Sequence, residues 1–144
     1  KNKILISEIK KLKLNNCVRL LGPVKNVSKV MNLLDIHVQS SASEGFPNVV
    51  AEAMVHKTPC VVTNVGDSSY IVGKTGWVVP PNDSVKLAKA IKTALNEIGT
   101  KNWNKKCNLA RERIKQKFSI DKMIKSYNKS WIKVYKKNNK RPNV

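Results

Sequence analysis

Apolar positions along the chain follow two spacings, and the change of spacing marks the predicted elements. Apolar residues three or four positions apart indicate helices, whereas short β-branched runs indicate buried strands. The predicted helices of the first half are 4–14, 27–34 and 48–56, and the predicted strands are 18–21, 35–39, 60–64 and 77–79. Strands that alternate with helices favour βαβ units, so we expect an α/β fold with a parallel sheet flanked by helices.

The part of the chain after Pro81 shows helical spacing alone. Asn82 or Asp83 can cap a first helix, and two more helices follow, the last of them beginning after Ser119. We expect these three helices to pack on one side of the sheet. Their aromatic residues lie at helical spacing and are interpreted as core rather than as base-stacking residues: Trp103, Phe118, Tyr127 and Trp131. Residues 1–137 are therefore predicted to form one domain, with a frayed basic tail at 138–144.

Composition places this domain in the cytoplasm. The chain has 144 residues, of which 41% are hydrophobic. No run approaches the roughly 20 apolar residues that a membrane span needs, and no signal-peptide pattern opens the chain. Cys17, Cys60 and Cys107 lie in apolar patterns without metal-ligand spacing, so we interpret them as reduced core thiols. No metal or cofactor is expected.

The net charge of +19 is concentrated in the two flanks. Residues 101–144 carry fifteen Lys and Arg against two acidic residues, whereas residues 31–100 carry five against six. A basic surface of this kind suits nucleic acid or an anionic membrane face. The alternative is a lysine-rich proteome whose solvated helix faces carry no such function.

Candidate chemistry is concentrated between Ser40 and Glu52. A strand ends, a loop of small residues follows, and a helix is predicted to begin at Pro47, a residue that favours the first helical position. Ligands of parallel sheets bind where such loops meet helix N-termini. The free N–H groups of Asn48 and Val49 would therefore bind a phosphate, and Gly45 would let the backbone approach it closely.

Two glutamates flank this predicted phosphate site. Glu52 lies one turn into the helix on the same face as Asn48, where its carboxylate can accept hydrogen bonds from two adjacent ribose hydroxyls. Glu44 lies on the loop and can accept from a group on the other side of the phosphates. The alternative interpretation is that the pair arises by chance and Glu44 only complements the helix dipole.

The string from Ser41 to Met54, Ser-Ala-Ser-Glu-Gly-Phe-Pro-Asn-Val-Val-Ala-Glu-Ala-Met, resembles the signature of the retaining GT-B glycosyltransferases of family four, the glycosyl transferases group 1. Further segments resemble the same family in the same order: 18–22, 34–38, 58–66 and 76–83. The resemblance covers nearly the whole chain and implies the C-terminal, donor-binding half of a GT-B enzyme, with a Rossmann-like sheet.

The resemblance also implies a role for each matching residue. Glu44 is the candidate catalytic residue, which would hold hydroxyls of the donor sugar and stabilise charge as the phosphate leaves. Glu52 would bind the ribose, and Pro23 and Val24 would line the base pocket. The remaining donor-binding candidates would hold the sugar and the diphosphate: Gly45, Phe46, Pro47, Asn48 and Val49. The family is usually metal-independent, and a uridine diphosphate sugar is the expected donor.

Two positions depart from the family pattern. Lys57 stands where the family normally has Gly, so it must take a left-handed conformation at a cost of about 1–2 kcal/mol or shift the helix cap. The loop after Val65 reads Gly66-Asp67-Ser68-Ser69-Tyr70, without the usual second Gly and Glu. The first strands of the family's domain and its N-terminal acceptor domain are also expected to be missing from this chain.

The predicted activity is transfer of a sugar from a nucleoside diphosphate sugar to a hydroxyl, with retention of the anomeric configuration. The expected acceptor is a cell-envelope glycan or a lipid-linked saccharide. The protein is expected to be cytoplasmic and bound peripherally at the inner face of the membrane. This fragment alone is expected to be inactive, and no specific nucleic acid is expected as a partner. Two alternatives stay open: a basic nucleic-acid-binding module that uses the C-terminal helices, and a non-catalytic nucleotide-sugar-binding domain.

Overall fold

Three short parallel strands form the centre of the fold. In the computed structural model, which describes residues 2–138, their order is β1 (His37–Gln39), β2 (Cys60–Thr63) and β3 (Trp77–Val79). Val38 is in register with Val61, and Val62 with Val78. All four residues of β2 are buried, because this strand has a neighbour on each side and helices on each face. The predicted parallel α/β fold is confirmed.

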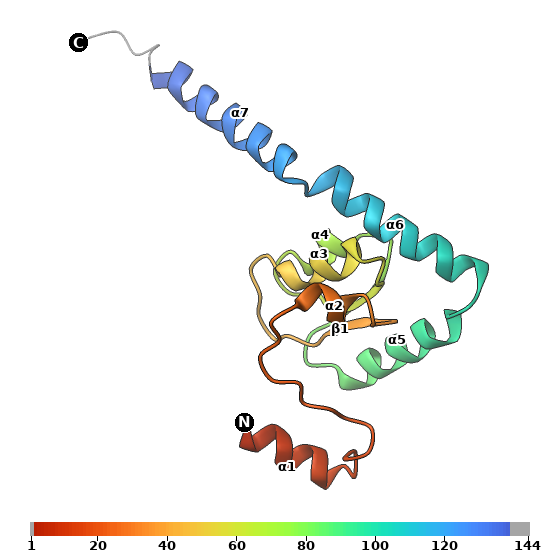
Figure 1. Ribbon diagram of the computed structural model, residues 1–144. Helices are drawn as coiled ribbons and strands as arrows, with labels where there is room; N and C mark the ends of the chain where they lie inside the picture. The colour runs from red at the N-terminus through yellow and green to blue at the C-terminus, as the bar shows by residue number, and fades with distance from the viewer. Residues whose placement is uncertain (1, 139–144) are drawn as a thin grey trace.

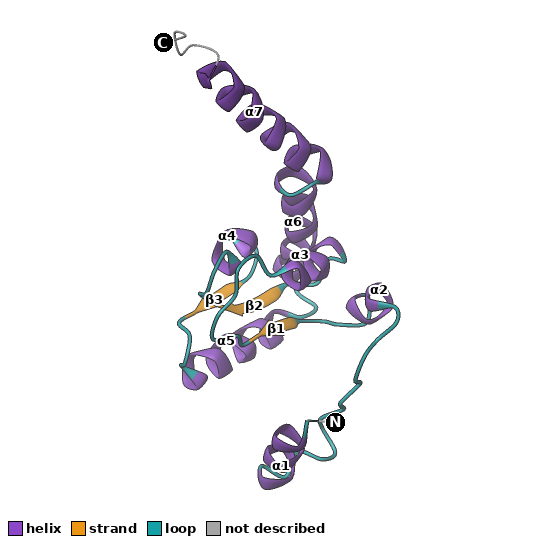
Figure 2. Cartoon of the chain, turned by 90° about the vertical axis from the view of Figure 1, so that its left-hand side faces the viewer, coloured by secondary structure: helices purple, strands orange, loops and turns teal. Residues whose placement is uncertain are grey.

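Helices cover both faces of the sheet (Figures 1 and 2). One face packs against α3 (Asn48–Val55) and α4 (Ser68–Val72), with α6 (Lys101–Lys117) packed on α3, and the other face packs against α5 (Ser84–Glu97). Successive residues of a strand point to opposite faces. Val62 accordingly joins the core under α3 and α4, whereas Val61 joins Ala90 and Ala94 of α5. The short helix α2 (Val27–Met31) adds Met31 to the first of these cores.

The three C-terminal helices do not lie on one side of the sheet as predicted. α5 and α6 cover opposite faces, and α7 (Ile120–Asn138) projects away from the sheet without a buried residue (Figure 1). The core interpretation is correct for Trp103, which is 8% exposed, and wrong for Tyr127 and Trp131, which are 55% and 65% exposed. The reason is that α7 continues outward from the end of α6, away from the sheet (Figure 1), so no part of residues 2–138 buries its apolar residues. The predicted tail, apart from Asn138, lies outside the described residues.

The N-terminal segment also differs from the prediction. α1 (Lys3–Lys11) has no buried residue, and the expected strand at 18–21 is exposed coil. A strand needs a neighbouring strand for its hydrogen bonds, and the described part of the chain places none beside these residues. Cys17 lies in this exposed segment, so its interpretation as a core thiol is wrong. Cys60, by contrast, is buried, and its burial raises the pKa of the thiol.

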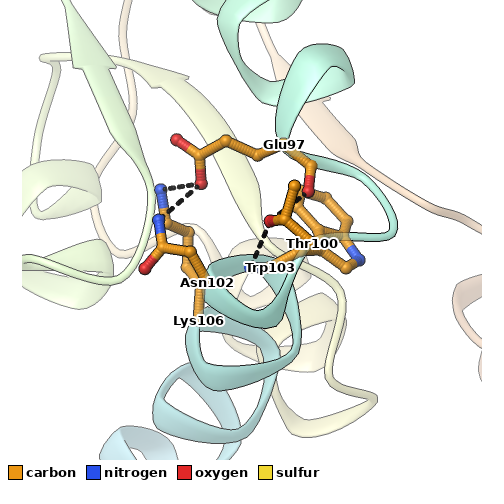
Figure 3. Close-up of polar contacts among 5 residues, drawn as sticks. All are labelled: Glu97, Thr100, Asn102, Trp103 and Lys106. Carbon is orange, nitrogen blue, oxygen red and sulfur yellow. Dashed lines mark hydrogen bonds and ion pairs between the residues drawn. The ribbon is translucent and has the colours of Figure 1, made fainter.

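A polar cluster fixes the turn between α5 and α6 (Figure 3). Glu97 accepts from the Lys106 ammonium at 2.8 Å, and Thr100 caps α6 through the Trp103 N–H at 3.1 Å. The same ammonium lies 3.8 Å from the centroid of the Trp77 ring, which joins the turn to β3 by a cation–π contact. This cluster lets α5 and α6 wrap opposite faces of the sheet.

Lys57, which follows α3, stands where the family normally has Gly, and its backbone conformation shows how the chain accommodates a side chain there. Its φ is +64°, so the left-handed alternative is the one adopted. We expect Lys57→Gly to raise the free energy of unfolding by about 0.5–1 kcal/mol, because relief of the left-handed strain exceeds the entropy that Gly adds to the unfolded chain. Asn82, at φ +58°, is the matched control, since Asn tolerates this conformation. Denaturant unfolding that shows equal changes for Lys57→Gly and Asn82→Gly would contradict this explanation.

Candidate functional site

The loop between β1 and α3 lies at the carboxyl edge of the sheet, where parallel α/β folds bind ligands. The end of β2 supports it from the side, because the Thr63 hydroxyl donates to the Ser41 carbonyl oxygen at 2.6 Å. Thr63 is buried, so this hydrogen bond fixes the start of the loop at the last residue of the central strand.

The first turn of α3 presents free N–H groups. The helix begins at Asn48, and Pro47 is its N-cap rather than its first helical residue, because the Pro47 carbonyl accepts from the N–H of Val50 at 3.1 Å. No side chain caps this end. The N–H groups of Asn48 and Val49 precede the first helical hydrogen bond, and both residues are exposed. This arrangement suits an anion such as a phosphate.

Glu44 lies beside this helix start, partly buried and held by two donors. Its Oε1 accepts from the Ser41 hydroxyl at 2.7 Å and from the side-chain amide of Gln39 at 3.1 Å. The Gln39 amide oxygen accepts in turn from the Ser68 hydroxyl at 3.1 Å. Neither Gln39 nor Ser68 was predicted to have a role at this site. The only signal was a polar residue at the end of a strand that was expected to be buried.

The turn after β2 presses against the backbone of the Glu44 loop. The N–H of Asp67 donates to the Gly45 carbonyl oxygen at 2.8 Å. Gly66 has a φ of +50°, and a Cβ at this position would overlap the carbonyl oxygens of Glu44 and Gly45. Only a residue without a side chain allows this approach. The second Gly of the family pattern is therefore not needed for it.

Glu52 follows the free N–H groups of α3 by one helical turn, on the helix itself. It lines a hollow of about 410 Å³ with the N-terminus of α2 and the end of α3, through Lys25, Asn26, Val27, Ser28, Met31 and His56. A second hollow is lined by Asn48 and Glu52 together, so the two residues share a face of the helix as expected. Pro23 and Val24 precede Lys25 in the same exposed segment.

Phe46 anchors the tip of the loop on the end of α6. Its ring lies 5.8 Å from that of Phe118, which also meets Tyr70 edge-on at 5.4 Å between centroids. Phe46 and Asn48 line a hollow of about 560 Å³ with Lys117 and residues of α7. Phe118, which was predicted as a core residue, is partly buried against the core under α3 and α4, and its contact with the loop was not predicted.

A sequence model of the family described as "Glycosyl transferases group 1" matches residues 2–97, more than half of the chain. The chain belongs to this family. Its fold is the C-terminal portion of a GT-B glycosyltransferase: Anabaena HepE in complex with UDP-glucose is 25% identical and superimposes with a TM-score of 0.81 over 91% of this chain. None of the helices in residues 2–138 has the length and apolar content that a membrane-spanning helix needs.

Two relatives of this glycosyltransferase domain illustrate the range of the family. N-acetyl-alpha-D-glucosaminyl L-malate synthase of Bacillus anthracis is 28% identical over 126 residues, which are 85% of this chain and 32% of that protein. The Vi polysaccharide biosynthesis protein VipC/TviE of Salmonella typhi is 22% identical over 78% of this chain and 20% of that protein. The chain covers 36% of HepE. It therefore spans about a third or less of the proteins that it matches.

The close approach of Gly66 to the carbonyl oxygens of Glu44 and Gly45 predicts that a side chain at this position destabilises the domain. We expect Gly66→Ala to lower the free energy of unfolding by about 1–3 kcal/mol more than Gly22→Ala, because only the first substitution places a methyl group against backbone carbonyls. Both glycines have positive φ, so their backbone strain is comparable, and a Cβ on Gly22 meets open space. If calorimetry shows equal losses of unfolding free energy for Gly66→Ala and Gly22→Ala, the close packing of the turn after β2 on the Glu44 loop does not contribute to stability.

Proposed function

We propose that this domain binds the nucleotide-sugar donor of a retaining glycosyltransferase and holds the sugar for transfer to a hydroxyl. The observation that carries the proposal is the pair of free N–H groups at the start of α3, with Glu44 on the loop before them and Glu52 one helical turn after them. A diphosphate bound there carries a nucleoside on one ester and a sugar on the other. The two glutamates would therefore meet the two ends of the donor.

The nucleoside end fits the Glu52 side. A carboxylate accepts hydrogen bonds from two adjacent ribose hydroxyls more strongly than a neutral group does. The hollow beyond Glu52 has the polar side chains of Lys25, Asn26 and Ser28 on its wall, where they would contact the base with the neighbouring Pro23 and Val24. A uridine nucleotide is the proposed donor, supported by the complex of HepE with UDP-glucose.

The sugar end fits the Glu44 side. Both donors to Glu44 within the described chain act on Oε1, which leaves Oε2 for sugar hydroxyls. The proposed work of this carboxylate is to orient the sugar and stabilise the charge that develops as the diphosphate leaves, assisted by the dipole of α3. The backbone of Gly45, Phe46 and Asn48 would contact the sugar and the phosphates.

We further propose that an acceptor-binding domain forms the other wall of the cleft. The chain spans about a third of its relatives, and α7 exposes an apolar stripe, including Ile124 and Trp131, that nothing in residues 2–138 covers. A cell-envelope saccharide is the proposed acceptor, supported by the relative named for Vi polysaccharide biosynthesis. The expected cytoplasmic location and the contact of the basic flanks with an anionic membrane stay predictions. A nucleic-acid-binding role would leave the whole 41–54 site without a use.

Substitution of the two glutamates separates their roles in the complete gene product. We expect Glu52→Gln to raise the Kd for uridine diphosphate about tenfold, because a charge-assisted contact with the ribose is lost. Glu44→Gln is expected to lower kcat about tenfold or more while the Kd for the nucleotide stays within about twofold. Calorimetric titration and a donor-turnover assay measure both effects.

Glu112→Gln is the matched control, because Glu112 is an exposed carboxylate on α6 whose ion pair within residues 2–138 is with Lys115 at 3.5 Å. Effects no larger than those of this control would contradict the assigned roles. Nucleotide binding without turnover toward any acceptor would favour the non-catalytic alternative, and absence of nucleotide binding at millimolar concentration would contradict the proposal as a whole.

A further inference from the structure

We propose that Gln39 and Ser68 form a positioning relay for Glu44, so that the turnover of the enzyme depends on two residues that touch neither the donor nor the acceptor. The inference rests on the proposed function, in which Glu44 holds the reacting sugar. It adds two residues that bring one carboxylate oxygen into a fixed place and leave the other oxygen for the substrate.

The direction of the hydrogen bonds in the relay follows from chemistry. An ionised carboxylate only accepts, so the Gln39 amide must turn its NH₂ group toward Glu44. Its oxygen then faces the Ser68 hydroxyl, which donates to it at 3.1 Å. Without the Ser68 hydroxyl, only Glu44 itself, among these contacts, would favour this orientation of the Gln39 amide. Ser68 therefore fixes the amide, and the amide with Ser41 fixes Oε1.

Burial makes the relay rigid. Ser68 is fully buried and Gln39 is 6% exposed, so neither can exchange its partner for water. Hydrogen bonds in such a low-dielectric environment are stronger, and a partner lost there is costly. The relay also joins the carboxylate to the first residue of α4, next to the Asp67 N–H that holds the Gly45 backbone. Backbone and side chain of the loop are thus held by the same turn.

The distribution of buried polar side chains indicates a function at this loop. Five polar side chains are buried in residues 2–138: Gln39, Thr58, Thr63, Ser68 and Thr75. Three of them, Gln39, Thr63 and Ser68, act on the 41–45 loop or on a residue that holds it. An apolar residue at position 39 would suit the interior of a parallel sheet better, because parallel strands are usually apolar on both faces. The presence of Gln39 in the buried strand is therefore explained by its hydrogen bond to the Glu44 carboxylate.

Kinetics of the complete gene product test the relay. Gln39→Met keeps the approximate volume and removes the donor, and we expect kcat to fall about tenfold or more while the KM for the donor sugar nucleotide changes less than about twofold. Ser68→Ala should lower kcat in the same direction by a smaller factor. Thr75→Val is the matched control, because it removes a buried hydroxyl that donates to the Val72 carbonyl, outside the 41–45 loop. Its kcat should stay at the wild-type value.

A double-mutant cycle separates positioning from structural support. If Gln39 acts through Glu44, Gln39→Met should change the single-turnover rate less than about twofold in a Glu44→Ala background. Independent, multiplicative losses would overturn the relay. The NMR signals of the Gln39 side-chain amide give a readout without activity: Glu44→Ala and Ser68→Ala should each shift them, and Thr75→Val should not. Unchanged signals in the first two variants would also overturn it.

Failure of the relay and failure of the proposed function give different results. A wild-type protein that turns over its donor, with a Gln39→Met variant of equal kcat, overturns the relay alone. A wild-type protein that neither binds nucleotide nor transfers sugar overturns the proposed function, and the positioning role falls with it.

Discussion

The contact between Gly66 and the carbonyl oxygens of Glu44 and Gly45 is the constraint on which the site depends. It brings the turn after β2 against the loop after β1, and three hydrogen bonds of the site lie in the same region. Asp67 holds the Gly45 carbonyl, Ser68 holds Gln39, and Gln39 holds Glu44. The free N–H groups of α3 start three residues after Gly45, so the same contact helps to set the place of the proposed anion site relative to Glu44. A side chain at position 66 would separate all of these parts.

The distribution of charge divides the domain into a nearly neutral centre and basic flanks. The region that builds the site, 31–100, has five basic and six acidic residues, so the proposed anion site depends on the N–H groups and dipole of α3 more than on lysines. The basic residues concentrate instead on α6 and α7. Because α7 exposes apolar residues as well, the proposed acceptor-binding domain would cover this apolar stripe and leave the lysines in solvent.

Much of this arrangement could be predicted from sequence. β3 was predicted at 77–79, and β2 within one residue at its C-terminus, because β-branched runs between turn residues are typical of buried strands. The candidate site was located from a loop of small residues before Asn48, and the structure places this loop at the carboxyl edge of the sheet. The resemblance to the family signature then indicated Glu44 and Glu52 as candidate site residues. These features are local in the sequence, so a short segment contains enough information to indicate them.

The features that could not be predicted depend on distant or absent neighbours. The expected strand at 18–21 did not form because strand formation requires a paired strand, which a local pattern cannot supply. Tyr127 and Trp131 lie in a helical stripe whose partner was wrongly taken to be the sheet. The Ser68–Gln39 contact joins residues 29 positions apart, and a single polar residue at the end of a strand does not reveal it.

The most direct measurement is a crystal structure of the complete gene product with a uridine diphosphate sugar. We predict diphosphate oxygens about 2.7–3.2 Å from the backbone nitrogens of Asn48 and Val49, with the ribose on Glu52 and the sugar on Glu44. A diphosphate bound elsewhere, for example among the lysines of α7, or a donor with its ribose on Glu44 and its sugar on Glu52, would contradict it.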